Sequence, residues 1–71
     1  MTYNQLVAHF GGLTKAAEAL DLHKQTIHAW KRMGRIPTDR QLKLARITGL
    51  KPDRTARKEA EEIAAYVNGN A

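Results

Sequence analysis

Apolar residues recur every three or four positions along most of this chain, which is the period of an amphipathic helix. The first stretch with this spacing contains Tyr3, Leu6, Val7 and Phe10. Thr2 precedes it, and Gln5 lies three residues after Thr2, which is the spacing of a capping box. Gly11 and Gly12 follow, and glycine readily adopts the left-handed conformation that closes a helix. The pattern therefore predicts a first helix over residues 3–10.

A second helical stretch covers residues 15–20, with Thr14 as its expected N-cap. Its apolar side consists of Ala16, Ala17 and Leu20. Leu22 lies off that side, so a continuous helix would leave it misplaced. Asp21 adopts left-handed backbone angles more easily than most residues. We therefore expect a turn over residues 21–23.

The third helix is predicted to begin at Lys24, because Ile27 and Trp30 define a new inward face. Gly34 and Pro37 mark its end and the following connection. The loop is therefore expected over residues 34–37.

Two further helices are predicted in the second half of the chain. Thr38 and Gln41 repeat the capping-box spacing, and Gly49 is the expected stop of the fourth helix. Its expected apolar side is Leu42, Ala45 and Ile47. Pro52 and Asp53 open a fifth helical pattern. The apolar stripe of that helix is Ala56, Ala60, Ile63, Ala64 and Val67.

These patterns predict an all-α fold, a compact five-helix domain that occupies residues 1–71 as a single unit. The fifth helix is expected over about residues 54–67, with a frayed tail at 68–71. Its apolar stripe could pack within the monomer or contact a second copy. The chain has no cysteine, so neither a disulfide nor a thiolate metal site is available to stabilise so small a core.

Charge is distributed unevenly along the chain. Residues 23–58 hold eleven of the twelve Lys and Arg but only two acidic side chains, which gives this block a net charge of +9. Residues 1–22 carry a net charge of −1, and residues 59–71 carry −3. A localised basic block attracts a polyanion, although the same charges also suit an ordinary solvated surface.

Several functional classes have little support in the sequence. The three histidines lack the i, i+4 spacing that places two imidazoles together on a helix, so we expect no metal and no cofactor. No set of nucleophile, base and acid is evident, and we do not expect an enzyme. The chain also lacks a signal-like N-terminus and a membrane-length apolar run, so we expect a cytoplasmic protein.

The second and third helices together have the composition of a two-helix DNA reader. Ala17 is the small residue where the helices approach, and Leu22 lies in the turn. Ile27 and Trp30 close the small core, and an inward Trp at this spacing is more often a core residue than a platform for base stacking.

Residues 13–32, LTKAAEALDLHKQTIHAWKR, resemble the helix-turn-helix of phage Cro and repressor proteins. Over roughly residues 3–50, the HFGG after the first helix, the W-K after the third and the I-P before the fourth resemble short Cro-like regulators. The family usually has glycine where this chain has Asp21. The resemblance implies a lambda-repressor-like fold and a transcriptional repressor that binds operator DNA through the major groove.

At 100° per residue, the third helix has a polar face opposite Ile27 and Trp30. The residues expected to contact bases are Lys24, Gln25, His28, Ala29 and Arg32. In the resembling family, the residues that match the first four of these face base edges. The residues expected near the DNA backbone are Thr14, Lys15, His23, Thr26, Lys31 and Arg35.

One recognition helix contacts few base pairs, so we expect a homodimer at least on the DNA. As a phage or prophage regulator, the protein would associate with the nucleoid of a bacterial host. Two alternatives stay open: an antitoxin-type autoregulator with the same motif, and a helical protein-interaction module that does not bind DNA.

Overall fold

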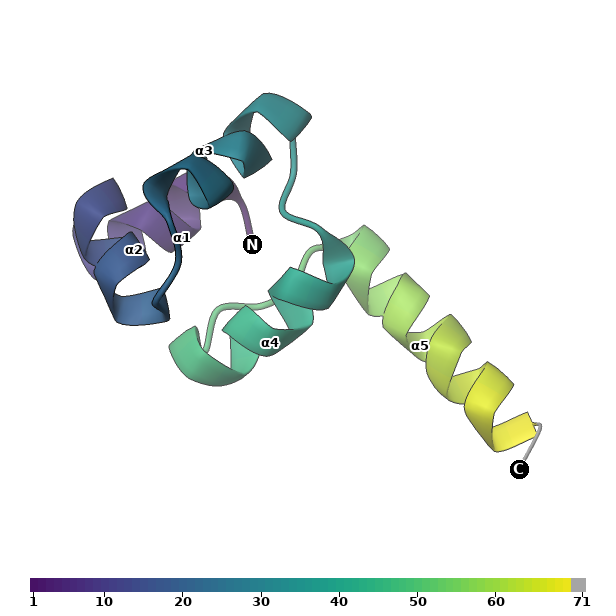
Figure 1. Cartoon of the computed structure of the whole chain (residues 1–71). Coiled ribbons are helices and arrows are strands. Elements are labelled where there is room, and N and C mark those ends of the chain that lie inside the picture. The colour runs from purple at the N-terminus through teal and green to yellow at the C-terminus, as the bar shows by residue number, and fades with distance from the viewer. Residues whose placement is uncertain (70–71) are drawn as a thin grey trace.

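The computed structural model describes the backbone of residues 1–69 and the side chains of residues 1–66. Within these residues the chain forms helices joined by short connections and no strand (Figure 1). The helices are α1 (Tyr3–Phe10), α2 (Leu13–Leu20), α3 (Lys24–Met33), α4 (Thr38–Thr48) and α5 (Arg54–Gly69). The predicted all-α fold with a helix-turn-helix is confirmed.

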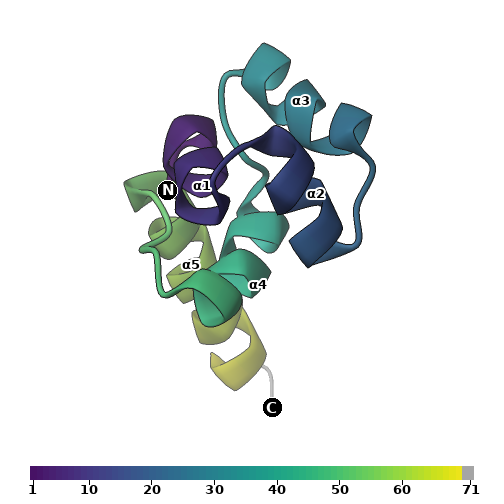
Figure 2. The same cartoon turned by 90° about the vertical axis from the view of Figure 1, so that its left-hand side faces the viewer.

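The first three helices pack closely against one another, as Figure 2 shows from the side of α1 and α2. Their buried apolar residues are Leu6, Ala16, Ala17, Ile27 and Trp30. The predicted inward residues of α2 and α3 therefore do form the small core of this unit. Removing these side chains from water is the main favourable term that holds the three helices together.

The predicted capping box of α1 is present. The backbone N–H of Gln5 donates to Thr2 Oγ1 at 3.1 Å, and the N–H of Thr2 donates to Gln5 Oε1 at 2.9 Å. Gly11 closes the helix with φ of 85°. The predicted N-cap of α2 is wrong, because Gly12 and not Thr14 precedes the helix. Gly12 turns the chain at φ of 135°, and its carbonyl accepts the N–H of Ala16, which places Thr14 within the first turn.

The turn between α2 and α3 forms where it was predicted. Asp21 has φ of 55° and ψ of 45°, and it is the non-glycine residue with positive φ in the described part of the chain. The N–H of Leu22 donates to the carbonyl of Ala17 at 3.0 Å, which closes the end of α2. An aspartate therefore makes the turn at modest conformational cost.

The predicted start and apolar side of α4 need correction. Pro37 precedes the helix, and no described side chain caps its first turn, so the Thr38–Gln41 capping box does not form. Gln41 and Leu44 are instead the buried residues of α4, whereas Ile47 is 65% exposed. Gln41 and Leu44 are three residues apart and share the inward face, with Ala45 partly buried against the core. Ile47 lies one turn beyond Leu44, where the two residues line an open hollow at the surface.

α5 begins after Asp53, whose Oδ1 accepts the backbone N–H of Ala56 at 2.8 Å and so caps the helix. Ala56 is fully buried near α4, and the helix then projects away from the other elements (Figure 1). It continues to Gly69, two residues past the predicted end. The Val67 side chain and residues 70–71 of the predicted tail lie outside the described residues. Over residues 1–69, no helix has both the length and the apolar character that crossing a membrane requires.

Candidate nucleic-acid interface

α3 has two sharply different sides. Ile27 is completely buried and Trp30 nearly so, and they attach the helix to α1 and α2. On the other side Lys24, Gln25, His28 and Arg32 are exposed, and Ala29 is half-buried between them. The five residues predicted to contact bases are therefore presented together along one side of a helix whose opposite side is fixed by packing.

Backbone hydrogen bonds hold the first turn of α3. His23 has extended angles, and its carbonyl accepts the N–H of Thr26 at 3.0 Å and of Ile27 at 3.4 Å. No described side chain caps the first turn of either α2 or α3. Backbone N–H groups at the start of α2, next to exposed Thr14 and Lys15, are consequently available to an anion.

The residues predicted to contact the DNA backbone differ in their surroundings. His23 and Lys31 are exposed, and Thr26 is half-buried. The ammonium nitrogen of Lys31 lies 5.9 Å from the centre of the Tyr3 ring, which directs this side chain along the surface toward α1.

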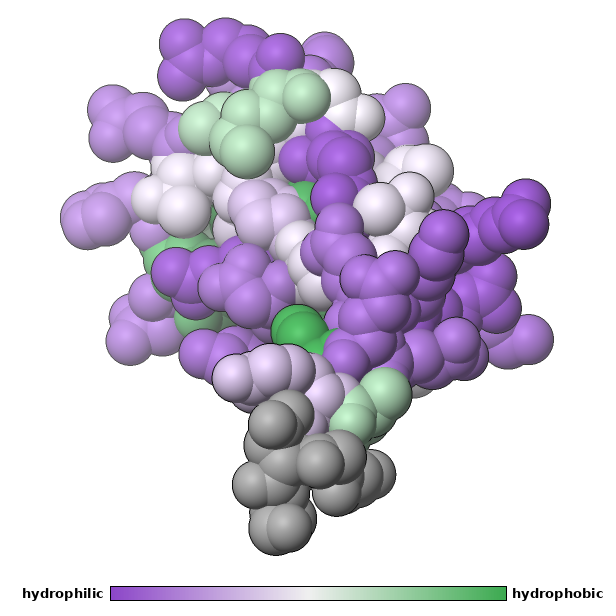
Figure 3. Space-filling view, turned by 90° about the vertical axis from the view of Figure 1, so that its right-hand side faces the viewer, coloured by the Kyte–Doolittle hydropathy of each residue, from purple (hydrophilic) through white to green (hydrophobic). Residues whose placement is uncertain are grey.

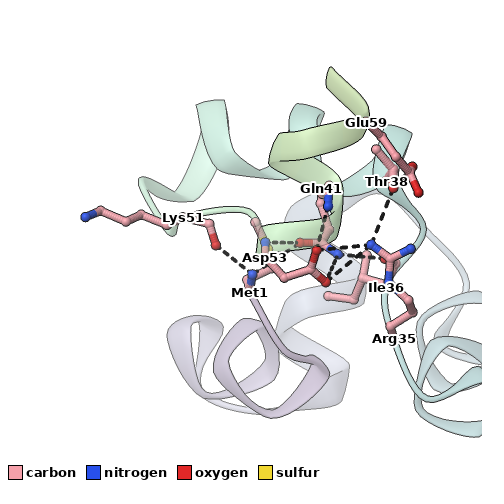
Figure 4. Close-up of polar contacts among 9 residues, drawn as sticks. Met1, Arg35, Ile36, Thr38, Gln41, Lys51, Asp53 and Glu59 are labelled. Atoms are coloured by element: carbon pink, nitrogen blue, oxygen red, sulfur yellow. Dashed lines mark hydrogen bonds and ion pairs between the residues drawn. The ribbon is translucent and has the colours of Figure 1, made fainter. Parts of the chain in front are cut away.

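Arg35 is engaged inside the monomer. Its Nη2 donates to both carboxylate oxygens of Asp53, at 3.1 and 3.3 Å, and lies 3.4 Å from Thr38 Oγ1 (Figure 4). The Thr38 hydroxyl in turn donates to Glu59 of α5. A phosphate contact by Arg35 therefore has to use guanidinium nitrogens other than Nη2. Arg35 ties the loop after α3 to the start of α5.

Gln41 is the centre of this polar cluster, a structural role that its position in the sequence did not predict. Its Nε2 donates to the carbonyl of Ile36 and to Asp53 Oδ2, both at 2.8 Å. Its Oε1 accepts from the N–H of Asp53 at 2.8 Å and from the amino group of Met1 at 3.2 Å. The signal that could have found it is its position one helical turn before Leu44, on the inward side of α4.

Two hydrogen bonds lower the pKa of Asp53 from its ordinary 3.8 to about 2. The larger contribution comes from Gln41 and the next from the N–H of Ala56. The nearby Arg35 guanidinium acts in the same direction, and partial burial of Asp53 opposes it. The carboxylate is therefore charged at neutral pH, where it can accept all of these hydrogen bonds together.

A helix-turn-helix with a packed second helix and an exposed basic side on it defines a class of DNA-binding proteins. Within that class, the chain matches the family model of the DNA-binding transcriptional regulator Cro over residues 2–61. The protein therefore belongs to this family of DNA-binding regulators. The match covers α1 to α4 and the first half of α5. Searches of the curated proteins and of the solved structures find no match.

Proposed function

We propose that this protein is a Cro-like repressor that binds operator DNA as a homodimer, with α3 in the major groove. The observation that carries the proposal is the division of α3 into a fully packed side and an exposed side with Lys24, Gln25, His28 and Arg32. A rigidly held helix with short and long polar side chains on its outer side suits recognition of base edges. Occupancy of the operator would then block transcription.

Base recognition in this proposal is divided among side chains with different chemistry. The Gln25 amide can donate to and accept from one adenine, whereas Lys24 and Arg32 can donate to guanine. His28 adds a donor or acceptor, and half-buried Ala29 leaves room for a thymine methyl group. We therefore assign the sequence preference to these five residues.

Contacts to phosphate would set the register of α3 in the groove without reading sequence. We propose that the start of α2 contributes Thr14 and Lys15. His23, directly before α3, and Thr26 and Lys31 on α3 contribute as well. We give Arg35 mainly a positioning role, because its Nη2 is bound to Asp53. Each phosphate neutralised by a cation adds about one to the steepness of the salt dependence.

The proposal is tested by a selection experiment and by two variants. The full chain is used to select sites from random duplexes, and binding is then titrated at low and high salt. We expect enrichment of a two-fold symmetric site. Gln25→Ala should relax the preference at one position in each half-site, at a cost of about 1–3 kcal/mol for the preferred base. Lys31→Ala should weaken all duplexes alike and reduce the salt slope by about one.

Lys58→Ala is the matched control for Lys31→Ala, because it also removes an exposed cation but lies on α5. It should leave both the affinity and the salt slope nearly unchanged. Failure to enrich any site would contradict sequence-specific recognition and favour a protein-interaction module. A selected site without symmetry, bound by one copy, would contradict the homodimer. An unchanged preference in Gln25→Ala would show that a different face contacts the bases.

A further inference from the structure

The second half of α5 projects from the molecule. All six side chains of residues 61–66 are exposed, including Ile63 at 59% and Tyr66 at 71%. We call residues 61–66 the α5 arm. The face of the molecule that carries α5 is mostly hydrophilic but contains separate hydrophobic areas (Figure 3). Exposed apolar side chains grouped together and rimmed by polar ones are a feature of interaction surfaces.

The α5 arm has two unlike sides. At 100° per residue, Glu62, Tyr66 and Ile63 lie within about 100° of one another, so a carboxylate borders two large side chains. Glu61 lies about 160° from Ile63, on the opposite side. The first of these sides is both apolar and acidic, so a surface that complements it is apolar and basic.

A hollow of about 190 Å³ with these properties lies between α4 and the helix-turn-helix. Its apolar lining includes Leu20 and Leu22 from the end of α2 and the turn, and Leu44 and Ile47 from α4. Arg40 and Lys43 line it as well and supply two positive charges. We call this hollow the α4 groove.

We propose that the α5 arm of one copy docks in the α4 groove of a second copy, with Glu62 near Lys43. The inference rests on the proposed homodimer and names its interface. The arm complements the groove in both charge and apolar character. A chain is not expected to fill its own groove, because α5 extends away from α2 and α3 (Figure 1).

We choose a second copy as the occupant of the groove because the contact would cover most of the exposed large hydrophobic residues. The large hydrophobic residues exposed in the described part of the chain are Met33, Ile47, Ile63 and Tyr66. Docking of the arm would cover three of these four. DNA is a poor occupant, because phosphates gain nothing from the apolar lining formed by Leu20, Leu22 and Leu44. A symmetric exchange uses the same contact twice, so each substitution acts at both places in the dimer.

Charge reversal tests the pairing in the full chain without DNA. Lys43→Glu and Glu62→Lys should each raise the dissociation constant of the dimer about tenfold or more, as measured by sedimentation over a concentration series. Mixing the two variants should restore the dimer. In the mixed dimer both contacts again join opposite charges, whereas each variant alone joins like charges.

Glu61→Lys and Lys51→Glu are the matched controls, because they reverse the same charges on the far side of the arm and on the α4–α5 connection. They should change the dissociation constant by less than about threefold. A dimer that responds to Glu62→Lys but not to Lys43→Glu would overturn the proposed groove. Monomers at every concentration, and one copy on a selected DNA site, would instead overturn the proposed homodimer.

Disulfide trapping distinguishes the groove from a direct contact between two arms. The chain has no cysteine, so a variant with Ile47→Cys and Ile63→Cys carries one thiol in the groove and one on the arm. We expect mild oxidation to link two copies of this variant and to leave Ile63→Cys alone unlinked. Efficient linking of Ile63→Cys alone would show that the arms pair with each other and would contradict the proposal.

Discussion

The first three helices are held together by an apolar core, to which Ile36 and Leu44 of the second half also belong, whereas the start of α5 is held by a polar cluster around Gln41. We call this cluster the polar joint. In α1–α3, Leu6, Ala16 and Ile27 have no exposed surface. At the joint, Gln41 is equally buried but makes hydrogen bonds to Ile36, Asp53 and Met1. Packing of apolar groups is non-directional, whereas hydrogen bonds require defined angles.

This difference indicates a division of tasks. The apolar core gives the helix-turn-helix most of its stability, so α3 is presented rigidly. The polar joint contributes less net free energy, because its groups also bond to water in the unfolded chain. It does fix the direction in which α5 leaves the molecule. We expect α5 to lose its position under milder stress than α3.

The largest effect should come from truncating a core residue of the first region. Ile27→Ala should lower the free energy of unfolding by about 2–5 kcal/mol, because it removes buried surface and leaves a cavity. Denaturant titration at a concentration where the chain is monomeric measures this loss. Ile63→Ala removes the same atoms from a side chain that is 59% exposed, and it should cost less than about 0.5 kcal/mol. Similar losses in both variants would contradict the assignment of Ile27 to the apolar core.

A smaller and more local effect is expected at the joint. Gln41→Leu keeps the side-chain size but leaves the Ile36 carbonyl and the Asp53 N–H without their partner, which costs about 1–3 kcal/mol. Amide hydrogen exchange should become faster in α4 and α5 and change little in α3. Gln25→Leu, at an exposed position, is the control. Equal loss of protection in α3 and α5 would show that the two regions unfold as one.

The pH dependence of Asp53 isolates the charged part of the joint. Its pKa is lowered to about 2, so it stabilises the folded state above pH 3.8, and that contribution disappears as the pH falls from about 4 to 2. One third of the side chain is exposed, so solvent screening limits the effect to about 1 kcal/mol. Urea titrations of the wild type and of Asp53→Asn should differ most above pH 4 and converge near pH 2. A difference that stays constant over this range would contradict the lowered pKa.

The predictability of the two regions from sequence also differs. The helices of the first region follow from period and from residues with special backbone preferences, such as Gly11 and Asp21. The inward positions of Ile27 and Trp30 follow from spacing alone. The exception is the start of α2, where Thr14 has the chemistry of an N-cap but Gly12 makes the turn. Local rules succeed here because each helix buries one simple apolar side.

The second region depends on contacts that are distant in sequence. Gln41 has the spacing of a capping residue after Thr38, and a local rule cannot recognise that Asp53 and Met1 will satisfy its amide. The same applies to the pairing of Arg35 with Asp53, eighteen residues away, which no local rule predicts. Polar residues have many possible partners, and only the tertiary structure selects among them. The predicted DNA contacts of α3 are at exposed or partly exposed positions but stay predictions.

The smallest expected effect concerns the ion pair itself. A double-mutant cycle of Arg35→Gln and Asp53→Asn should give a coupling free energy of about 0.2–1 kcal/mol, because both side chains are more than one third exposed. The coupling should fall further in high salt, since exposed charges are screened. Equilibrium unfolding of the four proteins measures it. A coupling that exceeds the loss caused by Gln41→Leu would mean that the ion pair, rather than the buried amide, holds the two regions together. The predicted order follows from burial: Gln41 has no access to water, whereas Arg35 and Asp53 can exchange their partner for it.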